Sequence, residues 1–394
     1  MDVLKYYMQR NIKLLYGLRF VRAFTVVVAV FVPFFQENGL SQTQIFVLQS
    51  IFAVAVLVLE IPSGYFADSI GRRRSLLIGG FLMSGGFMVY SLAFSFWPMA
   101  LAEIILGFGF SFISGADDAL AYDSLKVINK TEGYKAFEAR SNALIGFSEA
   151  GASLLGGALA LITLRTPVFA QIFIEALSIP LVLLMREPPR TKMVADNPLK
   201  DAFRVSKYAL HDHAEVKWLI LYGAMAGTLT HTMVWLTQPY YQLVGVPLGW
   251  FGVLWATQLV AMAVFSHYSV AYERWLGKRR ALISFPIIGV VTYLVVAAFP
   301  ILPILPVLLG FYFVRGVHIP ILKHYVNELV ESDIRATILS VKNFAQKLLY
   351  AGLGPLVGVV VDAYSLRTAL FFSAGIYGFL ALVVVLNMRR LKLL

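Results

Sequence analysis

The feature that most constrains this chain is a series of long apolar runs separated by turn residues and charge clusters. A bilayer core about 30 Å thick requires about 20 apolar residues per spanning helix, and these runs meet that requirement. They are continuous rather than alternating, which excludes a membrane β-barrel. We therefore predict an all-α membrane protein with twelve spans, at residues 14–35, 45–67, 75–96, 99–123, 139–162, 168–185, 218–243, 250–272, 282–299, 303–330, 336–361 and 366–388.

Composition agrees with this prediction and excludes most soluble classes. Hydrophobic residues make up 59% of the chain and charged residues 14%, whereas ordinary globular proteins contain about 25% charged residues. Cysteine is absent, so disulfides and thiolate sites are excluded. The basic first 13 residues lead into a full-length span with no cleavage site after it, so we expect them to remain in the mature protein.

The formal charge of +11 is explained by topology. Of the 33 lysines and arginines, 26 fall in the termini, in the even-numbered loops or in the span ends beside them, whereas Arg165 and Arg367 alone fall at the opposite ends of the spans. The positive-inside rule therefore places both termini in the cytoplasm, in a plasma or inner membrane. We expect no nucleic-acid partner, because these charges are spread over loops rather than gathered on one binding face.

The chain also divides into two similar halves. A polar stretch with three prolines at 186–217 is predicted to link a six-helix bundle at 1–185 to a second one at 218–394, with a short surface helix near 199–210. The sequence GRRRSLLIGG begins at Gly71, and GKRRALISFP begins at Gly277, each after the second span of its half. The offset of 206 residues favours a duplicated unit.

The loop after the second span carries the pattern Gly64-x-x-x-Asp68-x-x-Gly71-Arg72-Arg73. It resembles the loop signature of the major facilitator superfamily, and the span number, the linker and the half-repeat fit that family as well. The resemblance implies two six-helix bundles related by a pseudo-two-fold axis along the membrane normal, which transport by alternating access and need no oligomer. It also implies a gating role for these five residues, in which Asp68 caps the third span or pairs with a cation.

Two positions depart from the family pattern. In the second half Glu273 lies four residues before Gly277, whereas Asp68 lies three before Gly71, so the second copy of the signature is degenerate. In span four, many members carry an arginine four residues before a glycine, and here Glu103 takes that place before Gly107. The family's usual argument for proton coupling at that position therefore does not carry over.

Several ionisable residues fall inside the spans, where each one needs a partner, a wet cavity or a function. Arg19 and Arg22 share one face of span one, and Asp117 and Asp118 lie at a similar depth in span four. Matching depth and opposite sign predict an ion-pair network of Arg19 or Arg22 with Asp117 or Asp118 at the cytoplasmic mouth of the cavity. The alternative is a fixed structural pair with no role in transport.

Glu149 in span five is the leading candidate for a proton-coupling carboxylate, with Asp117 and Asp118 as further candidates. A carboxyl group in an apolar site binds a proton more readily than one in water. In the alternative, Glu149 pairs with Arg315 or Lys347 and stays ionised. Glu175 is discounted, because span six tends to lie outside the cavity in this fold.

Span seven presents candidate substrate ligands. His231, Trp235 and Gln238 follow the spacing of one helix face and are predicted to form an aromatic, hydrogen-bonding wall. Tyr240 and Tyr241 lie near the span end and are interpreted as interface anchors. The remaining candidate substrate ligands are cationic or imidazole side chains of both halves: Arg19, Arg22, Arg315, His318 and Lys347. Two histidines without a carboxylate beside them make a poor metal site, so none is assigned.

These observations favour a secondary transporter that is driven by protons and moves a small organic molecule. No phosphate-binding loop and no paired nucleophile and base occur, so neither an enzyme nor a cofactor is expected. Export is favoured over uptake, because an acidic first half and an aromatic wall suit amphipathic or cationic compounds. One alternative is an organic anion or a metal-chelating metabolite bound by the basic side chains. Another is a membrane sensor or scaffold that transports nothing and acts through the linker.

Overall fold

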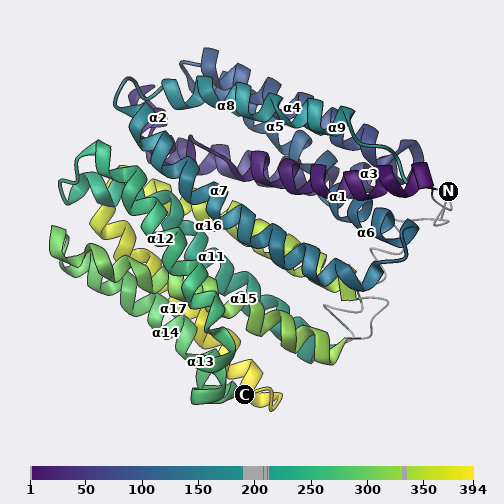
Figure 1. Cartoon of the computed structure of the whole chain (residues 1–394). Helices are drawn as coiled ribbons and strands as arrows, with labels where there is room; N and C mark the ends of the chain where they lie inside the picture. The colour runs from purple at the N-terminus through teal and green to yellow at the C-terminus, as the bar shows by residue number, and fades with distance from the viewer. Residues whose placement is uncertain (1, 190–206, 208–210, 212, 331–334) are drawn as a thin grey trace. The chain divides into compact units, whose positions relative to one another are not determined.

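The computed structural model describes residues 2–189, 207, 211, 213–330 and 335–394. Every regular element in these ranges is helical, and twelve helical stretches are long and apolar enough to cross a membrane. The predictions of an all-α fold and of twelve spans are confirmed (Figure 1). The surface helix predicted at 199–210 lies outside the described residues, apart from Lys207.

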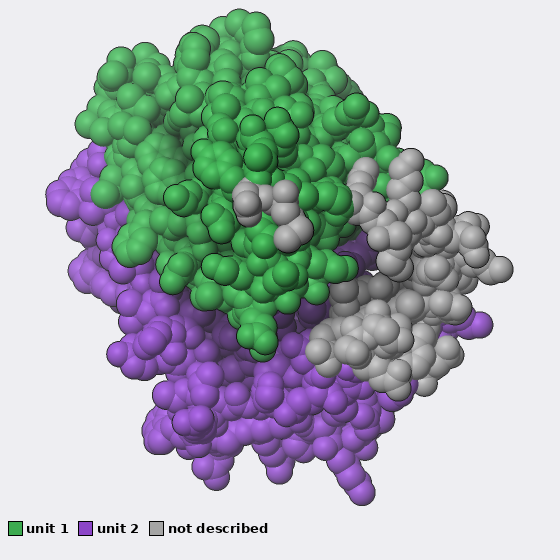
Figure 2. Space-filling model, turned by 45° about the vertical axis from the view of Figure 1, so that its right-hand side comes forward, with its two compact units in different colours: residues 1–39, 51–198 green, residues 40–50, 199–394 purple. Residues whose placement is uncertain are grey.

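The chain forms two compact units, shown in different colours in Figure 2. Unit 1 comprises Met1–Gly39 and Ile51–Pro198, and unit 2 comprises Leu40–Ser50 and Leu199–Leu394. The first half of the chain contains α1 (Asp2–Ala23), the 3-10 turn η1 (Val28–Val30), α2 (Phe31–Glu37), α3 (Gln42–Ile70), α4 (Arg72–Leu92), α5 (Phe96–Ile113), α6 (Ala116–Val127), η2 (Thr131–Gly133), α7 (Tyr134–Ala160), α8 (Thr166–Ala176) and α9 (Ser178–Leu183).

The helices of the second half all belong to unit 2. They are α11 (Ala214–Leu243), η4 (Leu248–Trp250), α12 (Phe251–His267), α13 (Ser269–Leu276), α14 (Lys278–Ala298), η5 (Leu302–Leu308), α15 (Leu309–Leu329), α16 (Arg335–Ala363) and α17 (Leu366–Arg390). In unit 2 α14 lies beside α17 and α11 beside α16, and in unit 1 α4 lies between α5 and α8 (Figure 1).

Helix α3 is shared between the two units, because its first turns pack with unit 2. Asp362 near the end of α16 accepts hydrogen bonds from the backbone N–H groups of Gln42 (2.9 Å) and Thr43 (2.8 Å). The carboxylate thus satisfies two of the N–H groups that the start of any helix leaves without partners inside the helix. This contact ties the segment Leu40–Ser50 to α16.

Span one is interrupted, which the continuous apolar run at 14–35 did not predict. Helix α1 ends at Ala23, and the chain resumes helical structure at η1 and α2. Gln171 of α8 bridges the break, since its Oε1 accepts the backbone N–H of Val26 (2.8 Å) and its Nε2 donates to the carbonyl of Phe24 (3.4 Å). Backbone groups freed inside a membrane need such partners, and a buried glutamine provides both a donor and an acceptor.

The structure repeats the duplication seen in the sequence. Helices α4 and α14 each contain 21 residues and lie 206 positions apart, and each follows a glycine with positive φ, Gly71 (127°) and Gly277 (75°). The repeat also explains the two arginines that stand apart in the charge count. Arg165 donates to the carbonyl of Ser91 (2.7 Å) at the end of α4, and Arg367 donates to the carbonyl of Ala297 (2.9 Å) at the end of α14. Both guanidinium groups satisfy helix carboxyl termini.

Candidate functional site

The strongest concentration of charge in unit 1 surrounds Arg19 of α1. Its Nε lies 3.2 Å from Asp117 Oδ2 and its Nη1 lies 2.7 Å from Glu138 Oε1, while its Nη2 pairs with Asp118. The predicted ion-pair network is therefore confirmed for Arg19 with both aspartates. The sequence did not single out Glu138, which immediately precedes the predicted start of span five. We call these four side chains the Arg19 cluster.

Local backbone geometry places the two aspartates. The chain between α5 and α6 turns at Gly115 with φ of +76°, a conformation that favours glycine. A new helix then begins at Ala116, so Asp117 and Asp118 occupy its first turn. Anions are stabilised at this end of a helix by the exposed N–H groups. Arg19 comes from α1, and Glu138 comes from the first turns of α7. Helix α1 packs against both α6 and α7, and α6 and α7 also contact each other within unit 1.

The Arg19 cluster lines a cavity of about 320 Å³, which falls within the range of small-molecule sites. Arg22, Ala23, Asn142 and Ile145 complete its lining. The arginine is the buried member, with 7% of its side chain exposed, whereas Asp118 is 53% and Glu138 34% exposed. The carboxylates of Asp118 and Glu138 are therefore the more accessible charges of the Arg19 cluster.

Arg22 lies one turn after Arg19 and differs from it in its contacts. It lines the same cavity, and its guanidinium lies 5.9 Å from the centre of the Phe110 ring. Its Nε is buried and has no hydrogen-bond partner among the described residues. Of the two arginines that the prediction offered as partners, Arg19 is therefore the one that pairs with the aspartates.

Two carboxylates, those of Asp123 and Glu187, hold the signature loop of unit 1, whereas the resemblance implied this role for Asp68. Arg72 pairs with Asp123 of α6, whereas Asp68 lies 3.8 Å from Arg72 as an exposed pair within one turn. The start of α4 is capped by Glu187, which accepts the backbone N–H groups of Arg72 (2.9 Å) and Arg73 (2.9 Å). Asp68 therefore pairs with a cation and does not cap the third span, and the cap comes from the residue after span six.

The two signature glycines differ in what they contribute. A Cβ added at Gly64 would meet nothing within 4 Å, so no close helix approach depends on it. Gly71 has φ of +127°, and a Cβ there would lie 3.3 Å from Glu187 Oε2. Gly71 thus permits the turn and also leaves room for the carboxylate of Glu187 that caps α4. Arg73 donates to the carbonyls of Val182 and Leu183 at the end of α9.

We expect Glu187→Ala to lower the free energy of unfolding of the purified protein by about 1 kcal/mol, as is typical when a helix cap is lost. The measurement is a thermal melt in detergent followed by tryptophan fluorescence. Glu187→Gln is the matched control, because its amide oxygen can accept one of the two N–H bonds. Equal melting of Glu187→Ala and the wild type would show that the cap contributes nothing.

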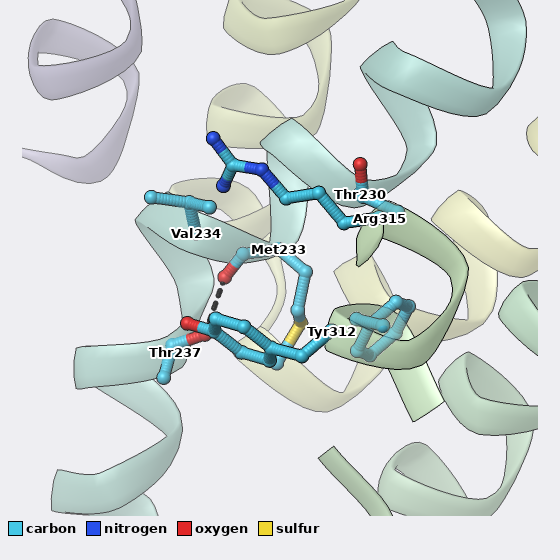
Figure 3. Close-up of a pocket in the computed structure, with 7 residues that line it drawn as sticks. Thr230, Met233, Val234, Thr237, Tyr312 and Arg315 are labelled. Atoms are coloured by element: carbon cyan, nitrogen blue, oxygen red, sulfur yellow. Dashed lines mark hydrogen bonds between the residues drawn. The ribbon is translucent and has the colours of Figure 1, made fainter. Parts of the chain in front are cut away.

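A second pocket lies inside unit 2 between α11 and α15. Its cavity of about 10 Å³ accepts one water molecule or one ligand oxygen. Figure 3 shows the Arg315 and Tyr312 side chains reaching from α15 toward α11, where Thr230 and Thr237 carry hydroxyl groups. Thr237 donates its hydroxyl to the carbonyl of Met233 (2.7 Å). Arg315 has no carboxylate within ion-pair distance among the residues that the structure describes.

The other predicted ligands of the second half lie in different settings. His231 is half-buried with its ring 4.6 Å from that of Tyr350, and His318 is buried with Nδ1 2.7 Å from the carbonyl of Val314 on its own helix. Trp235 accepts a hydrogen bond at its carbonyl from Gln42 (3.2 Å). Gln238 is buried in α11, and Lys347 is half-buried in α16. None of these residues lines the pocket beside Arg315.

The interpretation of Tyr240 and Tyr241 as interface anchors is wrong, because both side chains are fully buried in unit 2 and Tyr241 packs 5.1 Å from the Phe251 ring. Glu149 is half-buried in α7, and it does not line the cavity of the Arg19 cluster. Among the described side chains, no group of three or more His, Asp or Glu could hold a metal ion.

Comparisons with known proteins give these two sites their context. Residues 14–355 match the family profile described as Major Facilitator Superfamily. The chain belongs to the major facilitator superfamily. A relative from Bacillus subtilis (strain 168), "Uncharacterized MFS-type transporter YxaM", is 22% identical over 364 residues, which cover 89% of this chain and 88% of the relative.

Solved structures share the fold of this major facilitator protein. A variant of the nucleoside transporter NupG has a TM-score of 0.79 at 14% identity, over 98% of this chain and 99% of the other. An inward-facing bacterial homologue of the human lysosomal transporter Spinster has a TM-score of 0.78 at 17% identity, over 99% and 98%. A D-xylose–proton symporter has a TM-score of 0.72 at 16% identity, over 97% of each chain. At these identities the likeness shows the fold alone.

Proposed function

We propose that this major facilitator protein is a proton-coupled secondary transporter that exports small organic cations by alternating access. The observation that carries the proposal is the cavity of the Arg19 cluster, which combines a volume suited to a small molecule with two accessible carboxylates, those of Asp118 and Glu138. Proton coupling is a natural energy source for such a site, because a proton and an organic cation compete for the same negative field.

The cavity favours cations because its arginine is already occupied. Arg19 is buried and directs its N–H groups to three carboxylates, so it has little capacity left for an anionic ligand. Oxygens of Asp118 and Glu138 remain accessible to an incoming ammonium or amidinium group. A cation that binds these oxygens weakens their ion pairs with Arg19. The cation therefore has different affinities for conformations with and without these ion pairs, and such a difference is what lets a ligand shift a protein between two conformations.

The remaining finer points of the proposal rest on the sequence. We place both termini in the cytoplasm of a plasma or inner membrane, because lysines and arginines gather on that side of the chain. The bundles 1–185 and 218–394 move relative to one another, joined by the linker 186–217, and one copy of the chain suffices. Glu149, Asp117 and Asp118 remain candidates for the proton-binding group, and Asp68, Arg72 and Arg73 for the gate.

The test is transport by proteoliposomes with an internal pH dye, an imposed pH gradient and matched probes. Tetraphenylphosphonium and a quaternary-amine dye serve as cations, and citrate and benzoate serve as anions. We expect the cations to set off proton flux. Asp118→Asn should weaken apparent cation affinity about tenfold, which corresponds to about 1.4 kcal/mol. Glu132→Gln is the control, because Glu132 is an exposed carboxylate outside the cavity.

Two outcomes would contradict this proposal. Proton flux set off by anions alone would move the substrate site away from the Arg19 cluster. An Asp118→Asn protein with unchanged cation affinity would show that the cavity does not bind the substrate. A protein that moves no probe, but loses a cellular response when the linker is altered, would favour the sensor or scaffold instead.

A second candidate function, organic-anion transport, has its own supporting observation. Arg315 lies in a membrane-spanning helix with no carboxylate within ion-pair distance among the described residues, next to three hydroxyl-bearing side chains. Such a guanidinium is suited to bind a carboxylate or phosphate group of a substrate, and the small cavity beside it accepts one oxygen atom. In the same assay, Arg315→Gln would then abolish flux set off by citrate or benzoate and leave cation flux unchanged.

A further inference from the structure

The carboxyl group of Glu175 is the most isolated acidic group described in unit 1. Glu175 lies on α8 with 1% of its surface exposed. Its Oε1 accepts a hydrogen bond from Gln171 Nε2 at 3.3 Å, whereas its Oε2 has no partner among the described residues. Among the described residues, no lysine, arginine or histidine forms an ion pair with it. This setting differs from that of the Arg19 cluster, in which every carboxylate contacts a guanidinium.

An ionised carboxylate in such a place is energetically costly. Burial of a charge without a counter-ion costs several kcal/mol or more, whereas a neutral carboxylic acid leaves at most one polar group unsatisfied. A neutral carboxyl group is therefore the less costly form of Glu175 in these surroundings.

The neighbours of Glu175 connect it to the cavity. Of the elements packed against α8, α1 contributes Arg22, whose charge acts on the carboxyl. The charged residues of α4 lie in its first turn, where Arg72 pairs with Asp123 and Asp68 and Arg73 donates to carbonyls of α9, and α9 itself carries no charged residue. In α7, Glu138 pairs with Arg19, Lys135 and Arg140 are exposed, and Glu149 is half-buried. Arg22 thus lines the cavity and also acts electrostatically on the buried carboxyl.

The carboxyl is also connected to the break in span one. Gln171, which donates to Glu175, holds the backbone of Phe24 and Val26 on either side of that break. In many transporters, discontinuous helices form the sites of the substrate and the coupling ion. A change in the charge of Glu175 therefore acts on both the end of α1 and the side chain of Arg22.

We propose that Glu175 is the proton-binding residue of this transporter and that Arg22 is its alternating partner. With the proton bound, Glu175 is neutral and Arg22 faces the cavity with its Nε unpaired. When the proton leaves Oε2, the carboxylate attracts Arg22, which moves the end of α1 and changes the charge that lines the cavity. This inference rests on the proposed proton coupling, and it assigns that role to a residue other than Glu149, Asp117 or Asp118.

The first experiment detects the proton itself. An infrared difference spectrum of purified protein between acidic and alkaline buffer should contain the C=O band of a protonated carboxyl group in the wild type. That band should disappear in Glu175→Gln and persist in Glu103→Gln, a control in a second deeply buried glutamate. A band that persists unchanged in Glu175→Gln overturns the inference. Because glutamine resembles the neutral acid in shape and polarity, Glu175→Gln should fold.

The second experiment separates this inference from the proposed function. In proteoliposomes, Glu175→Gln should lose accumulation of tetraphenylphosphonium driven by a pH gradient but retain exchange of labelled for unlabelled probe. If the wild type shows no proton-driven transport and the infrared band is still lost in the variant, proton coupling fails and the protonation of Glu175 stands. If the wild type couples, and coupling is lost in Glu149→Gln but kept in Glu175→Gln, the assignment to Glu175 is overturned.

Discussion

Arg19→Met should lower the amount of folded protein more than any other single charge removal in unit 1. The substitution removes the guanidinium that lies between Asp117, Asp118 and Glu138. In the wild type its nitrogen atoms lie 3.2 Å from Asp117 Oδ2 and 2.7 Å from Glu138 Oε1. Removing one partner of a buried ion pair costs about 3–5 kcal/mol, because the other charges stay buried and uncompensated. The partial exposure of Asp118 and Glu138 favours the lower end of this range.

The measurement is the yield and melting temperature of the detergent-solubilised protein by size-exclusion chromatography. Arg22→Met is the matched control, since Arg22 is one turn away and pairs with none of these carboxylates. The double variant Arg19→Met with Asp117→Asn should recover part of the loss, because one uncompensated charge is removed. Melting of Arg19→Met within experimental error of the wild type would contradict the view that Arg19 holds the cluster together.

Gly156→Ala is expected to have the second largest effect, and its cause is steric. A Cβ at position 156 of α7 would overlap the backbone carbonyl of Val26, in the segment that joins α1 to η1. A backbone atom cannot move aside as the end of a side chain can. Overpacking of this kind costs about 1–3 kcal/mol, and here it also displaces the break that Gln171 bridges.

Gly146→Ala in the same helix is the control, because a Cβ there would meet nothing within 4 Å. Alanine should favour the helix over glycine by up to about 1 kcal/mol at such a position. The two variants are therefore expected to shift the melting temperature in opposite directions. Equal shifts in one direction would show that close packing of α7 against span one is not what requires Gly156.

The sequence predicted the class of the fold because hydropathy and charge act locally along the chain. Twelve runs of sufficient length predicted twelve spans, and the two matching segments after Gly71 and Gly277 predicted the repeat that α4 and α14 display. The contact of Arg19 with Asp117 and Asp118 was also predictable, because depth in a membrane and sign of charge can be estimated from position alone.

Other features depended on partners that are distant along the chain. Hydropathy did not reveal the break after Ala23, which is stabilised by Gln171 some 145 positions later, nor the cap that Glu187 gives to α4. Arg165 and Arg367 stood out in the sequence because they lie on the side of the membrane with few basic residues. Their role depends on the tertiary structure, in which they donate hydrogen bonds to carbonyl groups at the ends of two helices.

The sequence by itself determined that this chain crosses a membrane with twelve helices, repeats a unit and belongs with the major facilitator transporters. Tertiary structure decided which buried charges are paired. It joined Glu138 to the Arg19 cluster, left Arg315 without an ion pair among the described residues and placed Glu175 in the core of unit 1. The physical reason is that the cost of a buried charge depends on the groups within a few ångströms of it, and those groups come from helices far apart in the sequence.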